Sequence, residues 1–119
     1  NEIATAVRQK LPLIEVIVNN HVLGMVRQWQ DLFYEKRYSA TVLDDGVDYV
    51  KLAEAMGATG YRATTRETFN EALKAALAAK TPVVIDCVIG CDDKVWPMVA
   101  PGADISTAFT GEDLAAAQS

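Results

Sequence analysis

The sequence predicts an α/β fold in which a parallel sheet carries helices on both faces. Three short segments rich in branched apolar residues, at 13–18, 59–63 and 83–89, have the length and composition of β-strands. Segments with helical spacing of apolar residues lie between them, and this order favours right-handed crossovers and a parallel sheet. The last segment is apolar at nearly every position, which is typical of a central strand covered on both faces.

The three predicted strands differ in character. Residues 13–18 form an Ile- and Val-rich run closed by two asparagines, and we expect this strand to be buried. Residues 59–63 form a shorter strand, and the run at 83–89 is interrupted only by Asp86. If all three strands are parallel, Asn20 lies at the carboxyl-terminal edge of the sheet.

Two helices are predicted beside the first strand. Residues 2–11 carry apolar side chains at helical spacing, and a proline follows them directly. In residues 24–38, Met25, Trp29 and Phe33 fall four residues apart. They therefore share one helix face.

Two further helices have predicted start and stop signals. Asp48 is the expected N-cap of the first, and Gly57 follows its end. Thr64 with Glu67 three residues later predicts a capping box that opens the second. Pro82 prevents this second helix from continuing into the last strand.

The domain prediction is one domain portion at residues 1–103 and a tail at 104–119. Three strands are few for such a sheet, and the sequence begins directly in a helical pattern. We therefore expect this chain to be the C-terminal part of a larger domain. The tail has weak periodicity and is expected to be either disordered or a short helix.

Composition excludes several classes of protein. The 119 residues carry a net charge of −5 with both signs mixed along the chain, so no basic face for nucleic acid is expected. No apolar run approaches the length of a membrane span, and no signal peptide is apparent. The spacing of Cys87 and Cys91 would suit half of a metal site, but structural thiols are the favoured interpretation.

The segment after the first predicted strand is the best candidate for binding chemistry. It reads Asn-Asn-His-Val-Leu-Gly, at residues 19–24, and ligands of parallel sheets gather where strands end. Asn20 offers a hard neutral oxygen of the kind that Mg²⁺ accepts, and Gly24 opens a helix whose amides could meet a phosphate. An ordinary turn or helix cap is the alternative interpretation of the two asparagines.

A longer stretch shows a family resemblance. Residues 18–34, Val-Asn-Asn-His-Val-Leu-Gly-Met-Val-Arg-Gln-Trp-Gln-Asp-Leu-Phe-Tyr, closely resemble the cofactor segment of acetolactate (acetohydroxyacid) synthases. These enzymes belong to the thiamine diphosphate superfamily. The resemblance continues through residues 37–39, 51–57 and 95–102, and so covers nearly the entire chain. The double asparagine is shared across the superfamily, whereas Gly-Met-Val-Arg-Gln-Trp-Gln is far more specific to the synthases.

The resemblance implies roles for five residues. Asn20 would supply its side-chain oxygen to Mg²⁺, and Val22 would supply its backbone carbonyl. Gly24 and Met25 would contact thiamine diphosphate, and Trp29 would form a wall of the pocket that accepts 2-oxobutyrate in preference to a second pyruvate. No catalytic residue is assigned within this chain.

The resemblance also implies an activity and its requirements. The full-length relatives condense pyruvate with pyruvate or 2-oxobutyrate to acetohydroxy acids for branched-chain amino-acid synthesis, with thiamine diphosphate, Mg²⁺ and FAD. The Asp of a Gly-Asp-Gly motif completes their metal site, and a Glu from a second catalytic subunit activates the cofactor. Neither is present in this sequence. We therefore expect the isolated chain to be inactive.

The expected partners are the remainder of the catalytic subunit, a second catalytic subunit and a regulatory small subunit. The expected location is the cytoplasm, or the plastid in a eukaryote. Four polar residues are candidates for contact with a carboxylate, but a solvated surface is the favoured interpretation for each: Arg27, Gln28, Lys36 and Arg37. His21 receives no acid–base role. Two alternatives stay open: another thiamine diphosphate-dependent carboligase or oxidase, and a non-catalytic α/β binding module.

Overall fold

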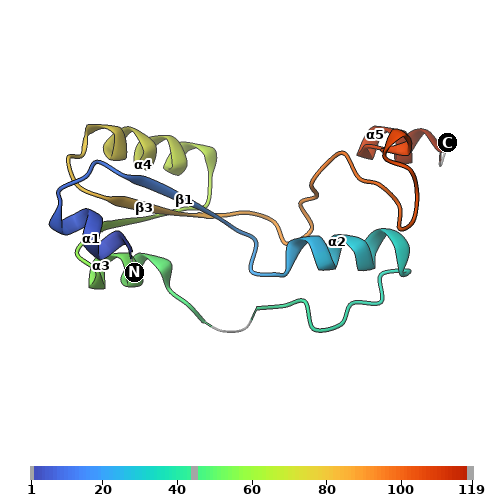
Figure 1. Cartoon of the computed structure of the whole chain (residues 1–119), viewed down its shortest axis with the longest axis horizontal. Helices are drawn as coiled ribbons and strands as arrows, with labels where there is room; N and C mark the ends of the chain where they lie inside the picture. Colours follow the sequence, from blue (N-terminus) through green and yellow to red (C-terminus); the bar gives the residue numbers. More distant parts are fainter. Residues whose placement is uncertain (1, 44–45, 118–119) are drawn as a thin grey trace. The chain divides into compact units, whose positions relative to one another are not determined.

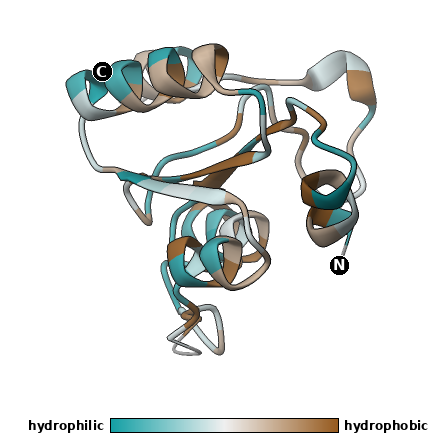
Figure 2. Ribbon diagram, turned by 90° about the vertical axis from the view of Figure 1, so that its left-hand side faces the viewer, coloured by the Kyte–Doolittle hydropathy of each residue, from teal (hydrophilic) through white to brown (hydrophobic). Residues whose placement is uncertain are grey.

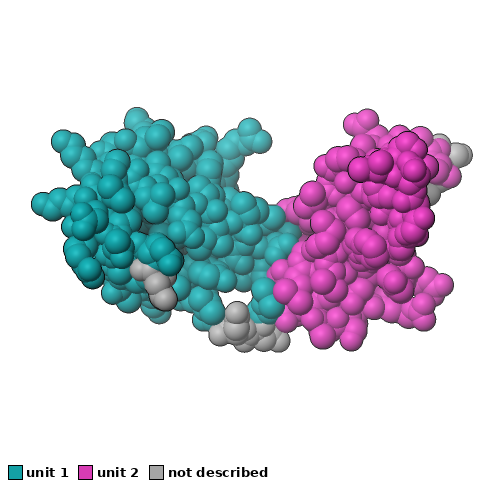
Figure 3. Space-filling model, viewed as in Figure 1, with its two compact units in different colours: residues 1–21, 43–90 teal, residues 22–42, 91–119 magenta. Residues whose placement is uncertain are grey.

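The computed structural model describes residues 2–43 and 46–117 of the chain. Two compact units are present, one formed by residues 1–21 with 43–90 and the other by residues 22–42 with 91–119 (Figure 3). The elements in chain order are α1 (Glu2–Arg8), β1 (Ile14–Asn19), α2 (Gly24–Phe33), α3 (Tyr49–Ala55), β2 (Thr59–Ala63), α4 (Arg66–Ala78), β3 (Val83–Val88), the 3₁₀ helix η1 (Ile105–Thr107) and α5 (Gly111–Ala117).

The first unit contains a three-stranded parallel sheet in the order β1-β3-β2. Helix α4 lies on one side of this sheet, and α1 and α3 lie on the other (Figure 1). The predicted α/β class with a parallel sheet and helices on both faces is therefore confirmed. The central position predicted for the last strand is confirmed as well.

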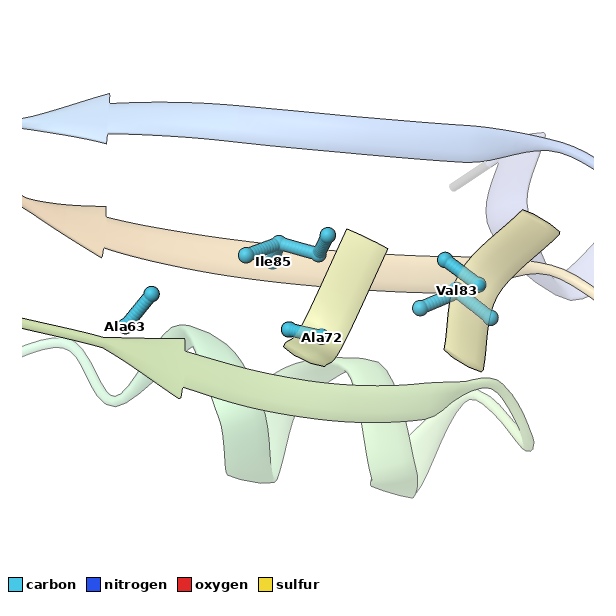
Figure 4. Close-up of a cluster of buried hydrophobic side chains, with 5 residues drawn as sticks. Ala63, Ala72, Val83 and Ile85 are labelled. Carbon is cyan, nitrogen blue, oxygen red and sulfur yellow. The ribbon is translucent and has the colours of Figure 1, made fainter. Parts of the chain in front are cut away.

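The two faces of β3 form two small cores. Val83 and Ile85 pack with Ala63 and with Ala72 on α4, as Figure 4 shows. The intervening Val84 packs with Ala53 and Ala58, and larger apolar side chains lie against this cluster: Ile3, Val7 and Ile17. Figure 2 shows hydrophobic colour on part of the sheet, a paler strand in front of it, and mixed colour along the helices, as expected for helices with one buried face.

Gly60 on β2 lets α3 approach the sheet closely. A Cβ atom at this position would lie 2.8 Å from Val50 Cγ1 and 2.9 Å from the Val50 carbonyl oxygen. Both distances are shorter than van der Waals contact. The absence of a side chain at residue 60 therefore sets the spacing between α3 and β2.

The prediction that the first strand is buried is wrong. β1 lies at an edge of the described sheet, with β3 on one side only. Val18 is consequently 68 % exposed and Val16 is 40 % exposed. An Ile- and Val-rich run favours a strand, but it does not say how many neighbours that strand has.

Two helices end earlier than predicted because residues other than glycine adopt left-handed backbone angles. Helix α1 ends at Arg8, since Lys10 has a φ of 54° and the Leu11 N–H donates back to the Ala6 carbonyl. Helix α2 ends at Phe33, and the residues at 35 and 36 have φ values of 54° and 58°. Helix stop signals based on glycine miss both ends.

The predicted caps are correct in one case and displaced in the other. The Asp48 side chain accepts from the Lys51 N–H at 3.2 Å, which confirms it as the N-cap of α3. The capping box of α4 is formed by Thr65 and Thr68, one residue later than the predicted Thr64 and Glu67. Consecutive threonines offer the same motif twice, and the strand β2 ending at residue 63 selects the second.

The second unit is built on α2 and the residues after β3. Met98 and Phe109 form an antiparallel pair with two hydrogen bonds of 2.8 Å between their backbones. The described tail thus contains η1 and α5 as short helices. No helix among residues 2–43 and 46–117 is long and apolar enough to cross a membrane.

Candidate functional site

The double asparagine lies where the predicted site requires it. Asn19 is the last residue of β1, so Asn20 follows at the carboxyl-terminal edge of the sheet and is half-buried. His21 is exposed and has a φ of 57°, a left-handed conformation that few side chains adopt. The chain therefore makes an abrupt turn at the residue that follows the candidate metal ligand.

The Asn19 side chain holds this turn. Its Oδ1 accepts a hydrogen bond from the His21 N–H at 3.1 Å, which closes an Asx-type turn around Asn20. Its Nδ2 donates to Asp86 Oδ1 on β3 at 3.0 Å. Asn19 is buried, so both halves of its amide need partners, and both have them.

Asp86 connects the turn to a line of charged groups. The Asp86 carboxylate is 2 % exposed and accepts from Arg62 Nε at 3.0 Å. Arg62 Nη2 in turn donates to Asp48 Oδ1 at 2.8 Å. The hydrogen bond to Asp86, followed by the charge of Asp48, raises the pKa of the Arg62 guanidinium. The Lys51 N–H and then Arg62 lower the pKa of Asp48.

Sequence reasoning missed Asp86 as part of this site. In the sequence it only interrupts an apolar strand, but a carboxylate inside a central strand requires a partner. That partner is its neighbour in the sheet, because Arg62 and Asp86 are paired in the register of β2 and β3. Arg62 is the one basic residue within the predicted strand at 59–63, so a search of the predicted strands for a partner to Asp86 would have found it.

Val22 is buried and pairs with Val42 in an isolated antiparallel bridge. The hydrogen bonds of this bridge are made by the flanking residues, from Leu23 N–H to the Thr41 carbonyl at 2.8 Å and from Leu43 N–H to the His21 carbonyl at 3.0 Å. In such a pair the backbone groups of the central residue point away from the partner segment. The Val22 carbonyl is thus directed away from residues 41–43.

Helix α2 presents the other predicted residues. Its N-cap, Leu23, makes no side-chain cap hydrogen bond, and Gly24 is its first residue. A hollow of about 280 Å³ lies along the helix and is lined by Met25, Val26, Trp29, Gln30 and Tyr34. The structure therefore brings Met25 and Trp29 to one apolar surface, as their spacing predicted.

The prediction of a solvated surface is wrong for Gln28. This side chain is 4 % exposed, and its amide bonds both backbone groups of Val95, each at 2.8 Å. Arg27 donates to Asp92 at 2.7 Å, and its guanidinium lies 4.0 Å from the centroid of the Tyr38 ring. The hydrogen bond from Arg27 lowers the pKa of Asp92.

An ion pair also joins α2 to the segment at residues 92–95. Lys94 Nζ lies 2.7 Å from Asp31 Oδ2 on α2, and the two side chains are 24 % and 14 % exposed. Lys94 is the main cause of the lowered pKa of Asp31. Polar side chains of α2 therefore hold residues 92–95.

The donor chemistry at 20–22 suits Mg²⁺ in kind. An amide oxygen at Asn20 and a backbone carbonyl at Val22 are both hard oxygen ligands. Among the described residues, no group of three or more His, Cys, Asp or Glu side chains is arranged to hold a metal ion. These residues thus provide two candidate ligands of the chemical kind that Mg²⁺ accepts.

Comparison with known proteins identifies the family. The family model described as "Thiamine pyrophosphate enzyme, C-terminal TPP binding domain" matches residues 1–87. The chain belongs to this family. Membership in this family agrees with the parallel sheet and its helices.

Similar members of the family are named acetolactate synthases. The chain is 47 % identical over 106 residues to the acetolactate synthase of Mycobacterium avium, covering 85 % of this chain and 17 % of that protein. It is 42 % identical over 105 residues to the acetolactate synthase isozyme 2 large subunit of Escherichia coli K12, covering 88 % and 19 %. The chain therefore spans less than a fifth of the length of these relatives.

A solved structure is similar to this chain in fold. The thiamine diphosphate-dependent 4-hydroxybenzoylformate decarboxylase of Rhodococcus jostii RHA1 aligns with a TM-score of 0.65 and 31 % identity, covering 74 % of this chain and 16 % of that one. The chain thus shares its fold with part of a thiamine diphosphate-dependent enzyme.

Proposed function

We propose that this chain is the C-terminal part of the catalytic subunit of an acetolactate synthase, which condenses pyruvate with pyruvate or 2-oxobutyrate. The observation that carries the proposal is the Asn19–His21 turn at the sheet edge, followed directly by the uncapped N-terminus of α2. A hard amide oxygen is of the kind that would hold Mg²⁺, and the amides of a helix N-terminus are of the kind that would face a phosphate group. The identity to proteins named acetolactate synthase supports the substrate class.

The residues of this chain would bind and orient. Asn20 and Val22 would hold Mg²⁺ through oxygen atoms, and the amides at the start of α2, from Gly24, would face a phosphate group. When bound, thiamine diphosphate supplies the nucleophilic carbon and the electron sink for decarboxylation of a 2-oxo acid. Met25 and Trp29 would provide an apolar surface beside the reacting groups.

The proposal extends to the whole protein from which such a chain would come. The remaining metal ligands and the cofactor-activating carboxylate would lie in the rest of the subunit and in a second catalytic subunit. FAD and a regulatory small subunit belong to the same proposal, as does a location in the cytoplasm or, in a eukaryote, the plastid. They rest on the resemblance of residues 18–34 to the synthases.

A binding experiment tests the metal site. In a complete catalytic subunit that carries this chain, Mg²⁺-dependent binding of thiamine diphosphate is measured by calorimetry for the native protein and for Asn20→Ala. Loss of a ligand oxygen should weaken the Mg²⁺ dependence strongly. The control is Asn70→Ala, which removes an exposed side-chain amide on α4 that belongs to no proposed binding contact. Unchanged Mg²⁺ dependence in Asn20→Ala would overturn the assignment.

The alternative is another reaction of the same family. The structural likeness to a 4-hydroxybenzoylformate decarboxylase favours it as the second candidate. Product analysis of the complete enzyme, with pyruvate and with an aromatic 2-oxo acid in separate assays, separates the two. An acetohydroxy acid supports the synthase, whereas an aldehyde released without condensation supports a decarboxylase. No turnover of any 2-oxo acid would instead favour a non-catalytic module.

A further inference from the structure

The buried Asp86 has no role among the metal and cofactor contacts proposed above, yet it is the most buried charged group described in the first unit. It lies on β3, one strand away from the Asn19–His21 turn, and bonds the side chain that holds this turn. We propose that Asp86 is a positioning residue that orients the candidate metal ligand Asn20 through the amide of Asn19. The inference rests on the proposed function.

The first step is the direction of the Asn19 amide. Asp86 Oδ1 only accepts at this contact, because its carboxylate already receives the Arg62 N–H on the other oxygen. The Asn19 NH₂ group must therefore face Asp86, and its carbonyl oxygen must face the His21 N–H. Turning the amide over would place oxygen against oxygen and N–H against N–H. Asp86 thus makes one of the two orientations strongly preferred.

The second step is the fixation of the backbone around Asn20. The Asn19 carbonyl accepts from the Ile89 N–H at 2.9 Å, and the His21 carbonyl accepts from the Leu43 N–H at 3.0 Å. The Asn19 side chain adds the third restraint and holds His21 at its left-handed φ of 57°. Asn20 is consequently held between two residues whose backbones are both fixed. Its side chain then leaves the turn in a defined direction.

The third step concerns the contacts that hold Asp86 itself in place. Arg62 joins Asp86 to Asp48, which is also the N-cap of α3. Asp86 is therefore held by Arg62 from β2, and Arg62 is itself held by the residue that caps α3. Groups that orient a metal ligand from behind commonly change metal affinity about 10- to 100-fold when they are removed.

The decisive experiment exchanges the carboxylate of Asp86 and the amide of Asn19 between the two positions. In Asp86→Asn, the new amide can accept from Arg62 only by turning its NH₂ group towards Asn19. The Asn19 amide then either meets that NH₂ group with its own or turns over and loses the His21 N–H. The double variant Asn19→Asp with Asp86→Asn removes this conflict, because the carboxylate now at position 19 accepts from both neighbours.

The first readout is the dissociation constant of Mg²⁺ at saturating thiamine diphosphate, in a complete catalytic subunit that carries this chain. We expect Asp86→Asn to raise it about 10- to 100-fold and the double variant to recover most of the loss. Asn19→Ala, which leaves the Asp86–Arg62 pair in place, should weaken Mg²⁺ binding in the same way and decides the question if Asp86→Asn does not fold. The control is Thr65→Ala, which removes the cap of α4 without touching the turn.

The second readout needs no metal. Hydrogen exchange of the His21 amide in the 119-residue chain should be accelerated by Asp86→Asn and slowed again in the double variant. The inference is overturned if Asp86→Asn or Asn19→Ala leaves Mg²⁺ affinity unchanged, if the double variant does not recover it, or if Thr65→Ala weakens it equally. Failure of Asn20→Ala to affect Mg²⁺ binding would be separate, since it rejects the metal site itself.

Discussion

The side-chain amide of Gln28 bonds the backbone of Val95 in both directions, donating to its carbonyl and accepting from its N–H, each at 2.8 Å. This contact ties α2 to the segment after β3. Gln28 is 4 % exposed, so its amide makes both bonds from a buried position, where a lost hydrogen bond costs more than at the surface.

Gln28→Ala should therefore destabilise the second unit by about 1–3 kcal/mol, because two hydrogen-bonding groups of Val95 lose their partner. Gln30→Ala is the matched control, since Gln30 makes the same two-way contact with Ser39 at an exposed position. Its loss should be smaller. Urea denaturation followed by tryptophan fluorescence measures both, because Trp29 and Trp96 both belong to this unit. Equal losses would contradict the role of burial.

Gly60→Ala should destabilise the first unit by about 1–3 kcal/mol, because the new methyl group would overlap Val50. Adding Val50→Ala should recover only part of this loss. The shorter side chain removes the contact with Cγ1 at 2.8 Å but leaves the backbone oxygen at 2.9 Å. Thermal unfolding followed by circular dichroism of the single and double variants measures the effect. Complete recovery would show that the backbone contact does not limit the packing.

Asp48→Asn should change how stability depends on pH. The pKa of Asp48 is lowered in the folded protein by the Lys51 N–H and then by Arg62. Its charged form therefore contributes stability above the ordinary value of 3.8, and this contribution is lost as the pH falls through the lower folded value. Asparagine still caps a helix but carries no charge. The native protein should exceed the variant at pH 7, and the difference should shrink in acid; a constant difference would contradict the assignment.

In a complete synthase, Trp29→Ala should reduce the preference for 2-oxobutyrate over pyruvate as acceptor. The extra methylene of 2-oxobutyrate would lose a wall of the hollow on α2, which corresponds to about 1–3 kcal/mol, or roughly a tenfold to two-hundredfold change in product ratio. Competition assays with both 2-oxo acids measure this ratio. Asn20→Ala is the contrast, since it should weaken both products alike. An unchanged ratio in Trp29→Ala would make Trp29 a packing residue.

The isolated chain should form no acetolactate from pyruvate with added thiamine diphosphate and Mg²⁺. The described residues supply only the two candidate metal ligands at 20 and 22 and no cluster of acidic or imidazole side chains. Product assays against a buffer blank measure this. Turnover by pure protein would show that the proposed division of the site between chain segments is wrong.

The strands were predictable because their apolar runs are short and bounded. The predicted limits of 59–63 agree with β2, and those of the other two strands differ from β1 and β3 by one residue. Helix ends were less predictable. Lys10 adopts a backbone conformation for which glycine is the usual signal, and its own side chain gives no sign of it.

The places of the candidate residues in the fold could be predicted from the sequence, but the hydrogen bonds that hold them could not. Asn20, Gly24 and Trp29 could be placed from local patterns and resemblance, because each belongs to one contiguous segment. The contacts of Gln28 with Val95 and of Asn19 with Asp86 each join residues 67 positions apart. Local periodicity carries no information on such pairs, so the supporting hydrogen bonds became visible only in the structure.

The alternation along β3 also constrains how the sheet can assemble. Val83 and Ile85 face α4, whereas Val84 and Asp86 belong to the opposite side. Pairing the strands one residue out of step would exchange these faces. A carboxylate would then lie among the alanines of α4, and Arg62 and Asn19 would lose their acceptor. A single acidic residue, Asp86, thus favours the native strand register over a register shifted by one residue while the chain folds.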